Sequence, residues 1–388
     1  MPSAARHTQS INVPLSYPVC FTRNAWGADN PVMAGVFSEA APQPARLAVY
    51  IDAGVAAAHP GLEAEITAYA AGHGAVMELA EAPHILPGGE PVKNGWHCVN
   101  RIIADLARLK LCRHSFVVAI GGGALLDAVG FAAALVHRGI RLIRMPTTTL
   151  AQGDSGVGVK NGINLDGAKN MLGTFAPPYA VVNDAAFLST LSGDLVRDGM
   201  AEAFKVAIIR DGEFFRYMAS NADRISRAEA PVIEECVRRS ALIHLEHIRG
   251  AGDPFEFGVS RPLDFGHWSA HRLETMSGFS LRHGQAVGIG IALDACYAWK
   301  LDMITRGEME SIHGAMRGCG IALYNDLLSA RDDTGRLQVL AGLEQFREHL
   351  GGRLSITLPT AIGAAVEVHA MQSETIEEST AYLAKAYG

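Results

Sequence analysis

The sequence predicts an α/β protein in which an N-terminal half built around a parallel sheet is followed by a mostly helical C-terminal half. As far as about Asn183, short apolar runs alternate with helical stretches, which is typical of βαβ units. From about Phe187 onward the chain reads as helices. Its 388 residues, 49% of them hydrophobic, are enough for two domains. We therefore expect one domain over 1–183 and a second over 184–388.

Composition narrows the class of protein. The net charge of -7 is modest and spread along the chain, which argues against nucleic acid or an anionic membrane as the main partner. Six cysteines lie far apart without a CxxC pair, so neither a disulfide framework nor a zinc ribbon is indicated. The N-terminus lacks a basic-then-apolar signal pattern, and no run of about 18 apolar residues could span a membrane. These features predict a cytoplasmic enzyme.

The first elements along the chain can be assigned from apolar runs. Residues 1–30 are polar, and we expect them to be irregular. The first strand is predicted over Ala45–Ile51, and it ends at Asp52. An acidic residue at a strand end often holds a ribose hydroxyl, although a plain turn explains the same residues equally well. A helix near Leu62–Gly72 and a strand near Ala75–Leu79 follow.

A glycine triplet lies between a predicted strand and a predicted helix. Pro87–Lys93 opens a helix to about Leu109, and the strand after Ser115 then runs directly into Gly121–Gly123 and a helix containing Asp127. Residues without a Cβ let phosphates approach backbone N–H groups at the positive end of a helix. The triplet is not the GxGxxG fingerprint. Strand, glycines and helix in succession nevertheless favour a dinucleotide over a mere turn.

A segment rich in glycine and charge follows the strand Ile140–Met145, which ends in hydroxyl side chains at Thr147–Thr149. We expect the stretch from Ala151 to Gly173 to be a shaped loop over a charged ligand. Its polar residues include Asp154, Lys160, Lys169 and Asn170. Two lysines in such a loop could bind a phosphate; a solvated surface loop is the alternative.

Three histidines and a carboxylate are candidate metal ligands in the second half. His267 and His271 lie four apart in one uninterrupted segment, so on a helix they share a face one turn apart. His283 follows an expected helix end and could turn back to the same point. Glu202 shares a helical face with Lys205 in an apolar segment, where a carboxylate is costly unless paired or metal-bound. Surface or satisfied core histidines are the alternative interpretation.

Six motifs taken together carry a family resemblance. They are GGGALLDAVGFAAALVHRG, MPTTTLAQGDSGVGVKNGINLDGAKN, AEAFK, FGHWSAH, HGQAVGIG and LPTAIG. In this order and spacing they resemble the dehydroquinate synthase superfamily, the sugar phosphate cyclases, over about Asp52 to Gly363. The resemblance implies a Rossmann-like NAD-binding N-terminal domain, a mostly helical metal-binding C-terminal domain and an active site between them.

The resemblance also implies site residues. The implied metal ligands are Glu202, His267 and His283, a set that leaves a position open for substrate, as in catalytic zinc sites; cobalt is an alternative metal. The implied NAD contacts are Asp52, Glu90, Lys93, Gly121, Gly122, Gly123, Asp127, Thr147, Thr148, Lys169, Phe187 and Thr190. The implied catalytic residues are Asp154, Lys160, Lys205, Asp264 and His271. The implied substrate-binding residues are Asn170, His349 and Arg138, the last reaching across from the second subunit of a homodimer.

Departures from the dehydroquinate synthase pattern bear on the substrate. Glu246 stands where the family has a lysine, Ser260 where it has an arginine, and Asp264 where it has an asparagine. A late family lysine falls at Glu348 or His349. A substrate carboxylate would lose cationic partners and meet an added anion. We therefore expect a neutral-headed ketose phosphate as the substrate.

This pattern is similar to the cyclases that use sedoheptulose 7-phosphate, especially 2-epi-5-epi-valiolone synthases. Sister enzymes make 2-epi-valiolone or desmethyl-4-deoxygadusol from the same sugar. The implied reaction removes hydride from C5 to NAD, eliminates phosphate from C7, returns the hydride and closes the ring by an intramolecular aldol, so that NAD is regenerated. The alternatives are a 3-dehydroquinate synthase and an NAD-dependent, metal-containing alcohol or glycerol dehydrogenase, which would have little use for the basic segment.

Overall fold

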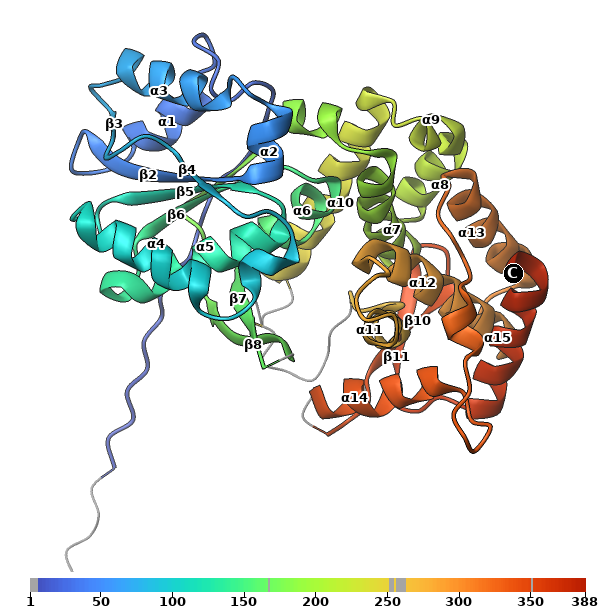
Figure 1. The fold of residues 1–388 in the computed structure, drawn as a ribbon. Coiled ribbons are helices and arrows are strands. Elements are labelled where there is room, and N and C mark those ends of the chain that lie inside the picture. Colours follow the sequence, from blue (N-terminus) through green and yellow to red (C-terminus); the bar gives the residue numbers. More distant parts are fainter. Residues whose placement is uncertain (1–5, 167, 251–254, 256–262, 350–351) are drawn as a thin grey trace, which may run out of the picture.

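A seven-stranded parallel sheet forms the centre of the N-terminal half (Figure 1). The computed structural model describes residues 6–166, 168–250, 255, 263–349 and 352–388. The strand order is β1-β9-β6-β5-β2-β3, and β4 also pairs with β2. The strands are β1 (Val19–Thr22), β2 (Ala45–Asp52), β3 (Met77–Leu79), β4 (His84–Leu86), β5 (Phe116–Gly121), β6 (Arg141–Pro146) and β9 (Ala180–Asp184). The predicted α/β fold is confirmed.

Helices cover both faces of this sheet (Figure 1). On one face lie α1 (Val32–Ser38) and α3 (Leu62–Gly72), and on the other α4 (His97–Arg108) and α5 (Gly123–Leu135). Successive side chains of a strand point to opposite faces. Along β2, the first apolar core receives Leu47, Val49 and Ile51, and the second receives Ala48 and Tyr50. Burial on both faces explains why the strands read as continuous apolar runs.

The C-terminal half packs around the buried helix α7 (Gly193–Arg210). The other helices of this half are α8 (Gly212–Ser220), α9 (Ala222–Ser226), α10 (Ala230–Gly250), α11 (His267–Met276), α12 (His283–Lys300), α13 (Arg306–Gly318), α14 (Ala341–His349) and α15 (Ser373–Tyr387). Their apolar core runs from Leu188 to Leu383, whereas the last buried residues of the two cores on the sheet are Phe187 and Ile163. This division supports the proposed domain boundary near Asn183.

Two predictions about irregular structure are wrong. Within residues 1–30, β1 pairs in parallel with β9 at the edge of the sheet. A strand of four residues that depends on such a distant partner has no recognisable pattern in the sequence. The stretch from Ala151 is not a loop either. It holds the end of the short helix α6 (Thr149–Gly153) and the antiparallel hairpin of β7 (Lys160–Leu165) and β8 (Ala168–Phe175).

Glycines explain why that hairpin resembles a loop. Gly162 and Gly173 lie opposite each other, and a Cβ on Gly162 would lie 2.7 Å from Leu172 O. The strands therefore pack too closely for side chains at this point. A second hairpin, β10 (Ile356–Ala361) and β11 (Ala364–Val368), lies in the otherwise helical half.

The helix predicted from Pro87 to Leu109 is divided in two. A 3-10 turn over Glu90–Lys93 is separated from α4 by Gly95, whose φ of +69° ends regular structure. The remaining element, α2 (Ala53–Ala58), follows β2 directly, and the Asp52 side chain accepts a hydrogen bond from Gly54 N at 2.7 Å.

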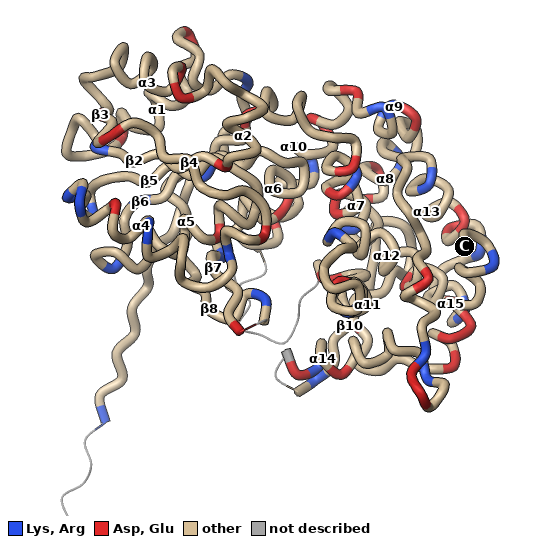
Figure 2. The backbone as a smooth tube through the Cα atoms, viewed as in Figure 1, with Lys and Arg blue, Asp and Glu red and all other residues tan. Residues whose placement is uncertain are grey.

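Charged residues of both signs are scattered over both halves of the molecule (Figure 2). Among the helices of the described residues, none is long and apolar enough to cross a membrane.

Candidate active site

Glu202 is a buried carboxylate in the middle of α7. It is 1% exposed, and its Oε2 atom lies 2.6 Å from Lys205 Nζ, one turn further along the helix. A buried charge is tolerated where a partner of opposite charge is close. The predicted shared face of these two residues is therefore confirmed.

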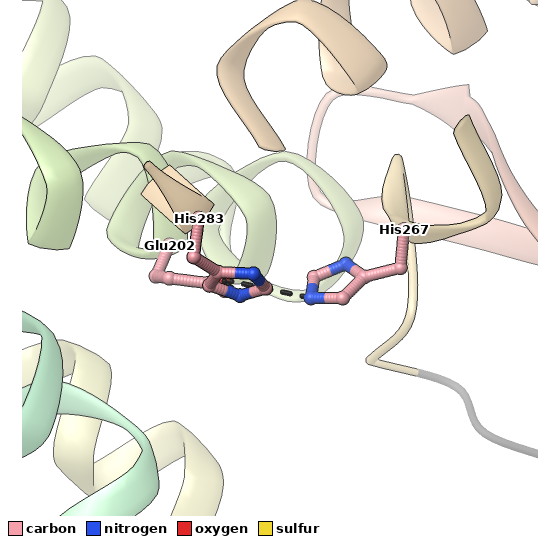
Figure 3. Close-up of side chains that lie close together, drawn as sticks. All are labelled: Glu202, His267 and His283. Carbon is pink, nitrogen blue, oxygen red and sulfur yellow. Dashed lines mark hydrogen bonds and ion pairs between the residues drawn. The ribbon is translucent and has the colours of Figure 1, made fainter. Parts of the chain in front are cut away.

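His267 and His283 complete a candidate metal site with Glu202. They are the first residues of α11 and α12, and their Nε2 atoms lie 3.5 Å and 3.1 Å from Glu202 Oε1. Figure 3 shows His283 beside Glu202, with the His267 ring facing both from the opposite side. One donor atom from each residue lies within 4.8 Å of the others. The structure thus brings together the three residues predicted as metal ligands.

The electrostatics of this triad suit a cation. Burial disfavours the Glu202 charge, but Lys205 and His267 hold the pKa of the carboxyl well below its usual range. The His283 side chain is 34% exposed, and burial of the rest favours the neutral ring, yet hydrogen bonds to Glu202 and Glu274 raise its pKa to about 10. Imidazole binds a metal only without its second proton. One carboxylate and two imidazoles fit a divalent metal that keeps positions for substrate oxygens.

His271 lies outside this triad, although its spacing from His267 suggests a chelating pair. The two rings are 5.4 Å apart between centroids. A second group of potential ligand atoms, again within 4.8 Å, consists of His271, Glu274 and His283. The assignment of His271 to the substrate stays a prediction.

Glu274 is a functional candidate that the sequence analysis missed. It is 3% exposed and lies 3.3 Å from His283 Nδ1, and Lys169 Nζ donates to it at 2.7 Å. Burial opposes its charge, but His283 and Lys169 lower the pKa of the carboxyl to about 2. Because Nδ1 faces Glu274, the Nε2 atom of His283 is the nitrogen left for a metal. Its position seven residues after His267, on the same helical face, is the signal that could have identified it.

A chain of polar side chains runs from the buried Lys205 through the half-buried Asp154 to α10. Lys205 Nζ is 3.7 Å from Asp154 Oδ2, and His244 Nε2 is 3.0 Å from Asp154 Oδ1. His244 Nδ1 donates to Ser240 O at 2.9 Å, which orients the ring. Burial opposes ionisation of Asp154, but His244 and Lys205 lower its pKa below the usual range. His244 was not predicted, because nothing in the sequence of α10 relates it to the distant Asp154.

A pocket of about 160 Å³ lies at the carboxyl edge of the sheet. Four of its lining residues are predicted NAD contacts: Asp52, Gly122, Gly123 and Thr148. The N-cap residue of α5 is Gly122, and among the described residues no side chain caps this helix, so its first N–H groups are available to a phosphate. Gly88 lies against Asp52, since a Cβ there would lie 2.4 Å from Asp52 Oδ1. The geometry matches the dinucleotide site expected from the glycine triplet.

The other predicted NAD residues lie outside the lining of this pocket. Gly121 and Thr147 are buried at the ends of β5 and after β6, and the Thr147 N–H donates to Gly121 O at 3.0 Å. Lys93 Nζ donates to Asp127 Oδ2 at 2.6 Å and to Asn170 Oδ1 at 2.5 Å.

Three more of these residues lie among other partners. Glu90 accepts from Asn164 Nδ2 at 2.7 Å. Phe187 packs edge-on against His59, whose Nε2 lies 2.9 Å from Thr190 Oγ1. Their contacts with NAD stay predictions, as does that of Lys169, which binds Glu274.

The predicted substrate residues come from several elements. Lys160 and Asn170 lie on the β7–β8 hairpin and are exposed, as is Arg138 in the turn before β6. Asp264 precedes α11. Burial lowers the pKa of Lys205, but the charges of Glu202 and Asp154 raise it, and Asp264 adds a smaller effect in the same direction. The last residue of α14 is His349, whose side chain lies outside the described part of the chain.

The structure changes one part of the charge argument. Glu246 was expected to add negative charge to the substrate site, but its side chain is 65% exposed and pairs with Arg249 at 2.6 Å. Solvent and this partner screen it, so its charge carries little weight in substrate choice. Ser260 lies outside the described residues, and Glu348 is exposed. Asp264 is the departure that the structure relates to the site.

The nucleotide pocket and the metal triad share α7. Leu195 and Asp198 from this helix line the pocket, and Glu202 follows Asp198 by one turn. Asp198 also accepts from Arg282 Nε at 2.7 Å, next to His283. Burial raises the pKa of Asp198, an effect that this bond opposes.

Comparisons with known proteins agree with this arrangement. Residues 83–198 match the family model for the 3-dehydroquinate synthase N-terminal domain, and residues 199–332 match that for the C-terminal domain. A 3-dehydroquinate synthase of Shewanella frigidimarina is 35% identical over 283 residues, which cover 72% of this chain and 76% of the relative. A 2-epi-valiolone synthase of Actinosynnema mirum is 33% identical over 276 residues, 71% of each chain.

A solved structure gives the same result across nearly the whole chain. The 2-epi-5-epi-valiolone synthase ValA from Streptomyces hygroscopicus subsp. jinggangensis 5008, with NAD+ and Zn2+ bound, superposes with a TM-score of 0.86 at 28% identity. The match covers 98% of this chain and 99% of that structure. Together, the two matching domain models, the curated relatives and this shared fold show that the chain belongs to the 3-dehydroquinate synthase family of sugar phosphate cyclases.

Proposed function

We propose that this protein is an NAD- and zinc-dependent cyclase that converts sedoheptulose 7-phosphate into 2-epi-5-epi-valiolone. The observation that carries the proposal is the shared helix α7. Asp198 lines the nucleotide pocket and Glu202 belongs to the metal triad, four residues or about 6 Å further along the helix axis. A sugar phosphate bound between them is within reach of both.

The residues present fit both cofactors. The pocket at the start of α5 offers uncapped N–H groups and a carboxylate, and the triad offers one carboxylate and two imidazoles. When bound, NAD takes up and returns a hydride at C5, and the metal polarises the sugar oxygens. ValA, solved with NAD+ and Zn2+, supports this pair of cofactors.

Side chains of this chain would handle the protons and the phosphate. Lys205 and Asp154, held together at 3.7 Å and backed by His244, form a pair of a buried cation and a half-buried carboxylate that can hold or release a proton beside the metal. Lys160 and Asn170 lie on an exposed hairpin suited to a phosphate. His271 is placed next to both histidines of the triad.

Asp264 supports a substrate without a carboxylate. Its charge acts on Lys205, so it lies within electrostatic range of the site. At an effective dielectric constant of about 20, two like charges about 4 Å apart cost on the order of 4 kcal/mol before relaxation. A heptulosonate carboxylate would meet this repulsion, whereas a sugar hydroxyl can donate a hydrogen bond to Asp264.

Two related activities are alternatives within the family. The 35% identity to a 3-dehydroquinate synthase favours the carboxylated substrate, and the 33% identity to a 2-epi-valiolone synthase favours a different stereoisomer from the same sugar. Desmethyl-4-deoxygadusol is a third product of this substrate class. An alcohol or glycerol dehydrogenase would instead use NAD stoichiometrically.

We also propose that the enzyme acts in the cytoplasm as a homodimer. Arg138 is exposed in a turn where His137, Arg138 and Gly139 have φ values of +52°, +66° and +124°. We infer from the family resemblance that this exposed guanidinium reaches the phosphate of a substrate bound to the second subunit.

The test is a product assay. Purified protein is incubated with NAD, Zn2+ and sedoheptulose 7-phosphate, and the product is identified by mass spectrometry and NMR. We expect one equivalent of phosphate per cyclitol and no accumulation of absorbance at the reduced nicotinamide band. Stoichiometric NADH would contradict the proposal and favour a dehydrogenase.

A further inference from the structure

The two imidazoles of the metal triad are held in different ways at Nδ1. The Nδ1 atom of His283 faces the carboxylate of Glu274 at 3.3 Å. The Nδ1 atom of His267 lies 3.1 Å from the backbone oxygen of Phe265. A carbonyl oxygen only accepts, so Nδ1 of His267 carries the proton and Nε2 is free to bind a metal. A carboxylate supports the first ring directly, and the second is bonded to a peptide group.

That peptide group is itself bonded to a carboxylate. The N–H of Gly266, in the same peptide unit as Phe265 O, donates to Asp294 Oδ2 at 3.0 Å. The indole N–H of Trp268 donates to Asp294 Oδ1 at 2.9 Å. Asp294 is fully buried on α12 and has no place in the proposed reaction. Its two oxygens therefore hold the residues on both sides of His267.

We propose that Asp294 is a positioning residue for the metal site, acting on His267 through the Phe265–Gly266 peptide and through Trp268. The negative charge polarises the peptide, which makes Phe265 O a stronger acceptor for the imidazole N–H. A stronger acceptor at Nδ1 makes Nε2 a better metal ligand. In this arrangement a carboxylate supports each imidazole of the triad, Glu274 directly and Asp294 across one peptide.

The backbone around Gly266 supports this role. Gly266 has a φ of +76°, and a Cβ there would lie 2.7 Å from Ile291 N. A Cβ on Gly290 would lie 2.0 Å from Gly266 O. The start of α11 is thus pressed against α12 without room for side chains, and Asp294 follows Gly290 by one turn. This contact fixes His267, at the start of α11, relative to α12, which begins with the other imidazole ligand, His283.

A buried carboxylate is a costly way to join two helices. Burial raises the pKa of Asp294 to about 7, although bonds from Trp268 and Gly266 lower it. Well-packed apolar residues of similar volume are often at least as stabilising as buried charges. Support of the metal site would explain why a buried carboxylate stands at position 294 despite its unfavourable burial.

The test compares three single variants by zinc affinity, measured in competition with a chromogenic chelator. Asparagine at 294 keeps the shape but offers one acceptor to two donors, so we expect Asp294→Asn to weaken zinc binding about 10- to 100-fold. Trp268→Phe removes the indole bond and some buried volume but leaves the charge of Asp294 in place, so it should weaken zinc binding less. The matched control is Tyr297→Phe on the same helix, which removes the acceptor of a part-buried hydrogen bond that Gln372 N donates at 2.9 Å. It should leave zinc affinity unchanged.

A double variant separates charge from shape. In Trp268→Phe/Asp294→Asn the competing donor is gone, and asparagine can still accept from Gly266 N. We expect its zinc affinity to stay about tenfold or more below that of Trp268→Phe alone, and the visible spectrum of the Co2+-loaded protein to change. The double variant also serves if Asp294→Asn alone does not fold.

Three results would overturn the proposal: zinc affinity of Asp294→Asn within about twofold of the unmodified protein, equality of the double variant with Trp268→Phe, or an equal loss in Tyr297→Phe. The inference rests on the metal site of the proposed function. Because zinc affinity is measured without substrate, its failure is distinguishable from failure of the proposed reaction.

Discussion

The nucleotide pocket and the metal site meet on α7 but are built from different materials. The pocket consists largely of backbone at strand ends and a helix start, with Asp52 at the end of β2 and Gly122 and Gly123 after β5, the strand that pairs with β2. The metal triad consists of side chains from three separate helices, α7, α11 and α12. A site made of backbone depends on local conformation, whereas a site made of side chains depends on how helices pack. The two should therefore fail in different ways.

The largest effect is expected at the metal site. His267→Ala leaves two ligands, so the metal and the several kcal/mol of charge stabilisation that it supplies should be lost, and turnover should fall about a thousandfold or more. Zinc content by elemental analysis, NAD affinity and the unfolding midpoint separate the causes. We expect NAD binding to persist.

The control for this variant is His313→Gln. His313 is a buried histidine of the same half, bonded to Ala292 O and Tyr387 Oη at 3.0 Å each. The His313→Gln protein should have a lower unfolding midpoint but an unchanged zinc content. A zinc-free His267→Ala protein that still cyclises its substrate would show that the triad is not the metal site.

A smaller loss is expected at Asp264. Asp264→Asn removes the charged acceptor for a sugar hydroxyl and should lower kcat/KM on sedoheptulose 7-phosphate about 10- to 100-fold. Because the repulsion from Asp264 is then removed, the variant should also narrow the preference for this sugar over the carboxylated heptulosonate. Glu246→Gln, an exposed change at a position paired with Arg249, is the matched control and should be silent. Equal losses in both variants would remove Asp264 from the site.

Substitutions in the nucleotide pocket should have smaller effects than those at the metal site or at Asp264. A Cβ in Gly88→Ala would lie 2.4 Å from Asp52 Oδ1 and must displace that carboxylate, so the Kd for NAD should rise about tenfold, the value of one hydrogen bond. Zinc affinity should not change. Gly72→Ala, with open space around its Cβ, is the control. Unchanged NAD affinity in Gly88→Ala would show that Asp52 does not contact the nucleotide.

The last variant test concerns the proposed second subunit. Inactive Arg138→Ala and inactive His267→Ala proteins are mixed under conditions of demonstrated subunit exchange. If Arg138 acts across the interface, half of the subunit pairs are mixed and each has one intact site, so about a quarter of the activity should return. No recovery would place Arg138 in the site of its own subunit.

The contrast between the two sites also explains what could be predicted. Periodicity and glycine placement indicated β2, β5, β6 and the start of α5, because these are local features. Local features were also misleading: the glycines of the β7–β8 hairpin resembled a loop, and β1 needed the distant β9 to exist as a strand.

The metal site could be predicted only in part from the pattern of residues in the sequence. Helical spacing paired His267 with His271, but packing of α12 onto α11 brings His283 to Glu202 instead. Family resemblance identified that triad, since no periodicity relates residues on three helices. Glu274, His244 and Asp294 support it from positions that only the folded chain brings together.

The measurement that tests the central claim most directly is a competition between two substrates. The unmodified enzyme, loaded with zinc and NAD, is given sedoheptulose 7-phosphate and the heptulosonate phosphate of 3-dehydroquinate synthase in separate assays and as a mixture. Repulsion from Asp264 of about 4 kcal/mol corresponds to a preference of about a thousandfold in kcat/KM for the sugar without a carboxylate. We predict conversion of sedoheptulose 7-phosphate to 2-epi-5-epi-valiolone with at least that preference. Comparable efficiency on both sugars, or a preference for the carboxylated one, would contradict the account and make the protein a 3-dehydroquinate synthase.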